Sequence, residues 1–149
     1  MKIKLSFFGK TSEVTEREKE LLKRISFRCP AEMQAMPQAG VRRGGCKTME
    51  AEKLLSKLDS SDFLVALDEK GQEMTSVEFS KKLKRWLTEH GTVHFVVGGA
   101  YGLSESVLKR ANVTLSFGRM TWTRELARLM LCEQVYRAGE IDGGSNFHK

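Results

Sequence analysis

The end of the chain gathers side chains that could handle a nucleotide. The last three residues, Phe147, His148 and Lys149, combine an aromatic ring, a titratable imidazole and a cation. A ring can stack on a base, a lysine can contact a phosphate, and an imidazole titrates near neutral pH. Upstream, Arg137 adds a permanent cation beside Tyr136. More ordinary roles stay open, because chain ends are commonly disordered and a cation near a helix C-terminus stabilises the helix dipole.

A glycine-rich stretch, "FVVGGAYGLSES" (95–106), is the second candidate site. An apolar run stops at Gly98 and Gly99, Gly102 follows, and a helix is expected to begin behind it. The spacing does not match the dinucleotide fingerprint, and the stretch lacks the lysine of a P-loop. Both phosphate-binding motifs are therefore excluded. Two interpretations remain: close approach of a flat neutral group such as an adenine or ribose, or a plain tight turn.

The third candidate, "LSFGRMTW" (115–122), lies between an expected strand and an expected helix. Met120 offers a soft sulfur and Trp122 an aromatic ring, which suit an apolar ligand. Alternatively, the segment is a hinge whose side chains pack into the core. In the helix that follows, Arg124, Glu125 and Arg128 are typical of charges on a solvated face.

Composition sets the broad class. The 149 residues, of which 40% are hydrophobic, predict a single domain over 1–149. A net charge of +6 favours an anionic partner. The apolar run Leu5–Phe8 is too short for a signal peptide, and no stretch reaches membrane-spanning length, so we expect a cytoplasmic protein with no membrane partner. The cysteines at positions 29, 46 and 132 lack paired spacing, which predicts neither disulfides nor a metal site.

Strand and helix patterns alternate along the chain, which predicts an α/β domain with a mostly parallel sheet. Strands are expected at 3–9, 31–36, 62–68, 92–97 and 113–117. Helices are expected at 11–27, at about 48–58, behind a Thr75–Glu78 capping box, behind Ser104, and from 123 to about 138.

The sheet suggests where a ligand would bind. The strand at 62–68 is apolar on both faces, which indicates a central position, and residues 69–74 are expected to form a loop behind it. Ligands of parallel sheets bind beyond the carboxyl ends of the strands. The candidate strand ends are therefore Leu67-Asp68, Gly98-Gly99 and the segment 117–122.

Six segments occur in one order over essentially the whole chain. They are "IKLSFFGK", "LDEKGQEMTSVEFS", "FVVGGAYGLSESVLKRA", "LSFGRMTW", "EQVYRA" and the final "FHK". Together they resemble the RlmH family, ribosomal RNA large subunit methyltransferase H, of the SPOUT superfamily. The resemblance implies an α/β knot fold with a C-terminal trefoil knot and an obligate homodimer. It also implies that S-adenosyl-L-methionine is used to methylate N3 of a pseudouridine in the helix 69 loop of 23S ribosomal RNA, on the assembled ribosome and without a metal.

The resemblance also assigns residues. Cofactor contacts fall on Leu67, Gly98, Gly99, Phe117, Gly118, Arg119, Met120, Thr121 and Trp122, at the same strand ends chosen above. The family's tail is thought to reach the active site from the neighbouring subunit, which makes Arg137 and His148 catalytic candidates. We hypothesise that Arg137 stabilises negative charge on the uracil oxygens and that His148 accepts the N3 proton or holds a phosphate.

RNA contacts are expected at two other places. A basic glycine loop holds Arg42, Arg43 and Lys47, which either bind phosphates or are simply solvated. Where many family members have Pro-His, this chain has Thr123-Arg124; Thr123 can cap the helix, and Arg124 offers a phosphate contact. In the tail, the usual tyrosine is replaced by a phenylalanine at position 147, which keeps stacking, and the lysine at 149 can reach phosphate.

Two other functions stay open at this stage. One is a binding module that keeps the SPOUT fold without methylating pseudouridine. The other is a SPOUT enzyme that acts on a different RNA, such as transfer RNA.

Overall fold

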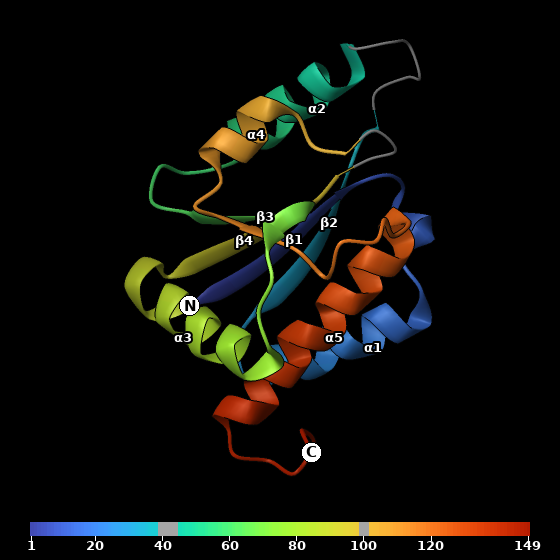
Figure 1. The fold of residues 1–149 in the computed structure, drawn as a ribbon. Coiled ribbons are helices and arrows are strands. Elements are labelled where there is room, and N and C mark those ends of the chain that lie inside the picture. Colours follow the sequence, from blue (N-terminus) through green and yellow to red (C-terminus); the bar gives the residue numbers. More distant parts are fainter. Residues whose placement is uncertain (39–44, 99–101) are drawn as a thin grey trace.

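The computed structural model describes residues 1–38, 45–98 and 102–149, with the side chains of 45–47 left aside. The chain forms one sheet with helices on both faces (Figure 1). In chain order the elements are β1 (Lys2–Phe8), the short 3-10 helix η1 (Thr11–Glu13), α1 (Glu16–Ser26), β2 (Ala31–Met36), α2 (Gly45–Ser56), β3 (Phe63–Gln72), α3 (Ser76–His90), β4 (Thr92–Val97), α4 (Glu105–Arg110), β5 (Val113–Leu115) and α5 (Arg124–Asp142).

All strand pairings are parallel, in the order β2-β1-β4-β3-β5. The predicted α/β class with a parallel sheet is confirmed. The strand β3 lies inside the sheet, although β4 and not β3 is the middle strand. Helices α1, α3 and α5 cover one face and α2 and α4 the other (Figure 1). Because the strands are parallel, their carboxyl ends share one edge, where ligands of such sheets bind.

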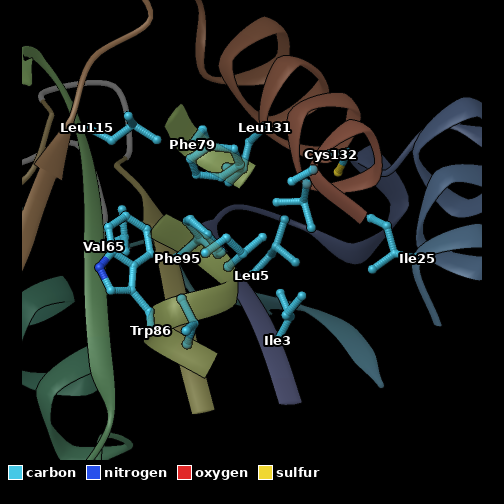
Figure 2. Packing of buried hydrophobic residues seen from close by; sticks show 14 of the residues in the cluster. Ile3, Leu5, Ile25, Val65, Phe79, Trp86, Phe95, Leu115, Leu131 and Cys132 are labelled. Carbon is cyan, nitrogen blue, oxygen red and sulfur yellow. The ribbon is translucent and has the colours of Figure 1, made fainter. Parts of the chain in front are cut away.

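The sheet is buried on both faces because apolar residues occupy successive positions along its strands. Val65 and Phe95 pack under α3 and α5 (Figure 2), whereas Leu64 and Val96 pack under α2 and α4. Successive strand residues point to opposite faces, so a continuous apolar run serves both cores. The apolar run at 62–68 therefore correctly indicated a strand covered on both sides.

The largest difference from the predicted elements lies after Leu67. The segment 69–72 was expected to be a loop, but it belongs to β3. Leu67 and Gln72 are both paired with Leu115, so residues 68–71 bulge out of the sheet. A Cβ on Gly71 would lie 2.7 Å from the backbone of Thr114, so only glycine allows the two segments to approach this closely.

The helix starts agree with the capping signals. Thr75 and Glu78 form a capping box, and Ser104 and Thr123 cap α4 and α5. The helix expected at 11–27 is broken, because Thr15 caps a new helix, α1, behind η1. The trefoil knot stays a prediction. None of the helices in the described ranges is long and apolar enough to cross a membrane.

Candidate functional site

A pocket of about 570 Å³ opens at the carboxyl edge of the sheet. It lies where the ends of β3 and β4 meet the loop that joins β5 to α5. All three strand ends selected from the sequence contribute to it. The expected residues that line it are Leu67, Gly98, Phe117, Gly118, Met120, Thr121 and Trp122.

The pocket has an apolar side and a charged side. Val97, Leu103 and Leu115 are buried apolar residues that line it, whereas Asp68, Glu69 and Lys70 line it from the bulge of β3. Oδ1 of Asp68 accepts a hydrogen bond from the backbone N–H of Lys70 at 2.8 Å, which fixes that carboxylate. Such walls suit a ligand with a flat apolar part and charged groups of both signs, because the apolar part is removed from water and each charge can face an opposite one.

The bulge and the loop before α5 are tied together. The hydroxyl of Thr121 donates to Oε2 of Glu69 at 2.6 Å. The Ser116 hydroxyl lies 3.1 Å from the carbonyl oxygen of Glu69 and 2.8 Å from that of Gly118, and it accepts from the Gly118 N–H at 3.1 Å. Gly118 has a φ of 117°, which L side chains rarely adopt. Two walls of the pocket are thus held at a fixed spacing.

Met120 and Trp122 do not pack into the core, so the hinge alternative is wrong for them. They are 72% and 43% exposed at the pocket. Exposed apolar residues at the edge of a pocket are available to a ligand or to another chain. Arg119, in the same loop, is exposed and is not a lining residue.

Gly98 is required by the turn itself. A Cβ on Gly98 would lie 2.7 Å from the carbonyl carbon of Gly102, a distance that atoms do not tolerate. Close packing of the chain against itself therefore explains this glycine without a ligand, as the plain-turn interpretation held. Gly99 lies outside the described residues.

The prediction that Arg128 lies on a solvated face is wrong, because its side chain is only 1% exposed. Its guanidinium pairs with the buried carboxylate of Glu18, donates to the carbonyl oxygen of Glu13 at 3.0 Å, and lies 4.3 Å from the centre of the Phe7 ring. Burial raises the pKa of Glu18, but hydrogen bonds from Arg128 and Thr15 outweigh it and hold that pKa below its ordinary value. No sequence signal distinguished Arg128 from a surface arginine.

Arg124 is also engaged rather than free. It lines the pocket and contacts Glu125, Phe8, Gln38 and Glu13 through its guanidinium. The solvated-face prediction is therefore wrong for Arg124 too, although Glu125 is exposed as expected.

The catalytic candidates lie at the other end of α5, where the C-terminus also lies (Figure 1). Arg137 donates to Oε1 of Glu133 at 2.9 Å, its Nη1 lies 3.2 Å from Nδ1 of His148, and its guanidinium lies 4.7 Å from the centre of the Phe147 ring. Lys149 is exposed. At about 1.5 Å per residue, α5 separates Arg137 from its own pocket-side end by roughly 20 Å. One protomer does not bring the two halves together.

The expected phosphate contacts Arg42 and Arg43 lie outside the described residues, and so does the side chain of Lys47. Among the residues that the structure does describe, no three His, Cys, Asp or Glu side chains are grouped to hold a metal ion.

The tie between Glu69 and Thr121 was not predicted. The strand-end position of Asp68 pointed to this region, but the expected loop at 69–74 concealed the bulge that turns Glu69 toward the segment 117–122. A glycine inside an otherwise strand-like stretch, at position 71, is the sequence signal that could have indicated it.

Comparisons with known proteins agree with this geometry. The family model described as "Predicted SPOUT methyltransferase" matches residues 1–148. A ribosomal RNA large subunit methyltransferase H from Anaeromyxobacter sp. (strain Fw109-5) is 42% identical over 132 residues, covering 87% of this chain and 86% of that one. The protein of the same name from Pediococcus pentosaceus is 35% identical over 159 residues, covering 100% of both.

Among solved structures, a probable methylase family protein from Haemophilus influenzae Rd KW20 superposes with a TM-score of 0.57. The match covers 99% of this chain and 70% of the other at 11% sequence identity. At that identity the likeness concerns the fold alone.

Proposed function

The chain belongs to the SPOUT methyltransferase family, and from that premise we propose that it is a methyltransferase of large-subunit ribosomal RNA. Its donor is S-adenosyl-L-methionine, and its target is N3 of a pseudouridine in the helix 69 loop of 23S ribosomal RNA on the assembled ribosome. A ribosomal substrate places the enzyme in the cytoplasm. The relatives that are 35% and 42% identical to this chain are named ribosomal RNA large subunit methyltransferase H, which supports the proposed reaction.

The observation that carries the proposal is the pocket at the carboxyl edge of the sheet. Its apolar side, with Val97, Leu103 and Leu115, fits an adenine, and the carboxylates of Asp68 and Glu69 on its charged side can face the positive charges of a sulfonium and an ammonium group. Bound there, S-adenosylmethionine supplies an electrophilic methyl group. The chain's part is to hold that group in line with the attacking nitrogen, an alignment that can lower the barrier by several kcal/mol, up to roughly 7 to 11 kcal/mol in the best-oriented cases.

The residues proposed to remove the N3 proton lie at the other end of α5. N3 of a pseudouridine carries a proton at neutral pH, so this proton leaves as the nitrogen attacks, and negative charge builds on the uracil oxygens. Arg137 stabilises that charge as a fixed cation, and His148, whose Nδ1 lies 3.2 Å from it, accepts the proton or holds a phosphate. Phe147 and Lys149 lie beside them to stack on a base and contact phosphate.

A homodimer would complete the site. The pocket and Arg137 lie at opposite ends of α5, and Met130 lies midway between these ends. An isologous pairing of two α5 helices about an axis near Met130 would bring the partner's Arg137 to the pocket. Leu126, at 47% exposure, and the exposed Trp122 supply apolar surface on the pocket side of that axis. Such an interface is self-complementary and removes this surface from water.

Ribosome recognition then depends on the dimer surface, because the residues that the structure describes are built around one sheet. We include Arg42, Arg43 and Lys47 as phosphate contacts. Replacement of all three by alanine is expected to weaken ribosome binding and to flatten its salt dependence. Binding whose salt dependence is unchanged would return these residues to a simple solvated role.

Mass spectrometry of ribosomal RNA from a deletion strain tests the function. We expect loss of a single methyl group from the helix 69 fragment, restored by a plasmid carrying the wild-type gene. An Arg137→Ala plasmid should fail to restore it, with Arg17→Ala, a surface arginine of α1, as the matched control. An unchanged methyl pattern would refute the ribosomal substrate, and methylation of isolated transfer RNA in its place would favour the retargeted enzyme.

A further inference from the structure

The guanidinium of Arg124 connects three separate segments at the edge of the cofactor pocket. Nη1 donates to the carbonyl oxygen of Phe8, at the end of β1, at 3.0 Å, and to Oε1 of Gln38 at 2.9 Å. Nη2 donates to Oε1 of Glu13 at 3.2 Å. Together with the Nε contact to Glu125 at 3.1 Å, these bonds use four of the five N–H groups of the side chain.

These bonds make a poor phosphate contact. A bidentate contact to a phosphate needs two N–H groups that point the same way, and only one of the five is left over by the contacts of the described residues. The charge of Arg124 also faces the carboxylates of Glu13 and Glu125. The side chain is only 20% exposed, so it does not extend into solvent toward an RNA.

Because of the position of Arg124, these bonds affect the wall of the pocket. It is the first residue of α5 and follows the loop 117–122, which forms one wall of the pocket. Gln38 follows the end of β2. A side chain that holds the start of α5 against β1, η1 and Gln38 therefore fixes the pocket wall relative to these three segments.

We propose that Arg124 is a positioning residue that holds the loop 117–122 in its cofactor-binding arrangement by fixing the start of α5 against β1, η1 and Gln38. It acts through the protein and not through a contact with RNA phosphate. This inference rests on the proposed function, and it assigns to Arg124 a task that histidine, with two ring nitrogens, cannot perform in the same way.

Two measurements on the full-length protein separate positioning from phosphate contact. Calorimetry measures the affinity for S-adenosylmethionine, and ribosome binding over a salt series measures the number of phosphates contacted. We compare Arg124→Ala, Arg124→Lys and the control Arg17→Ala. A lysine keeps the charge but cannot bond several acceptors in the fixed fork geometry of a guanidinium.

Positioning predicts that Arg124→Ala and Arg124→Lys both weaken cofactor affinity, by about five- to tenfold, without changing the salt slope of ribosome binding. The control keeps both quantities. A phosphate contact predicts the opposite: unchanged cofactor affinity, a salt slope smaller by about 0.7 to 0.9 in the alanine variant, and retention by lysine. That result would overturn the inference.

A milder variant guards against unfolding. Gln38→Ala removes one exposed acceptor and leaves no buried charge, and we expect it to weaken cofactor binding about two- to threefold. Combined with Arg124→Ala it should add nothing, because the shared bond is already lost. Fully additive effects on cofactor affinity would contradict the proposal, because they would show that Arg124 and Gln38 act independently. If the wild-type protein itself binds no S-adenosylmethionine, the proposed function fails and not this inference alone.

Discussion

The two ends of α5 carry arginines in opposite settings. At the pocket end, Arg128 is buried against Glu18 and Arg124 is bonded to several segments. At the other end, Arg137 contacts Glu133 on its own helix and His148 in the tail, both of which are partly or fully exposed. A cation paired with a buried carboxylate, as Arg128 is with Glu18, stabilises the fold, whereas Arg137 can exchange its exposed partners for a substrate.

The largest effect should come from breaking the buried pair. Arg128→Ala leaves the carboxylate of Glu18 buried without its partner, and we expect a loss of about 3 to 5 kcal/mol in the free energy of unfolding. Urea denaturation measures it. The matched control, Arg17→Ala, breaks an exposed pair with Glu20 and should change stability by less than about 1 kcal/mol. If both variants lost the same free energy of unfolding, the buried ion pair of Arg128 would contribute no more to stability than the exposed pair of Arg17.

A second test compares histidines. His94 is buried in β4, where its Nε2 lies 2.6 Å from the hydroxyl oxygen of Ser6, whereas His148 is exposed. Burial, together with the charge of Lys4, lowers the pKa of His94 to about 4. Between pH 6.5 and 4 the unfolded chain therefore binds a proton that the folded chain does not, so stability falls as the pH is lowered through this range, by up to about 3 kcal/mol.

Urea denaturation at a series of pH values checks this slope. His94→Asn should flatten it, whereas His148→Asn should leave it as in the wild-type protein. A slope that persists without His94 would assign the acid sensitivity to another group.

Removing Arg137, the cation with partly or fully exposed partners, should affect activity rather than stability. Arg137→Ala is expected to lower the methylation rate on the order of 10²-fold, as loss of one charge-stabilising donor does, while the free energy of unfolding changes by less than about 1 kcal/mol. Single-turnover assays on ribosomes and urea denaturation measure the two. A large stability loss with proportionate inactivation would make Arg137 as structural as Arg128.

The smallest effect concerns a single hydrogen bond at the pocket. Thr121→Val removes the hydroxyl that donates to the Glu69 carboxylate and leaves the contact between the Ser116 hydroxyl and the Glu69 carbonyl oxygen to hold the bulge of β3. We expect cofactor affinity to fall severalfold, corresponding to about 1 kcal/mol, because the carboxylate left behind is exposed and is solvated by water. Calorimetry measures it, with Thr88→Val on the outer surface of α3 as the control. Unchanged cofactor affinity would show that the loop 117–122 keeps its position at the pocket without the bond from Thr121 to Glu69.

Local signals in the sequence predicted most of the elements. The capping box of Thr75 and Glu78, and the strands at 31–36 and 92–97, depend on contacts within a few residues, so their sequence patterns describe them well. The bulge of β3 was missed because it depends on how Leu67 and Gln72 align with β5, a relation between segments far apart in the chain.

The amino-acid sequence was enough to predict the alternation of strands and helices, the strand ends that line the pocket, and the family. Hydrophobic periodicity, capping residues and motif order are all properties of the linear chain. The burial of Arg128, the contacts of Arg124 with three segments, and the distance of Arg137 from the pocket of its own protomer depend on the folded arrangement. Arginine has the same formula in each case, and its role is set by which acceptors the fold brings within hydrogen-bonding distance and how far it excludes water.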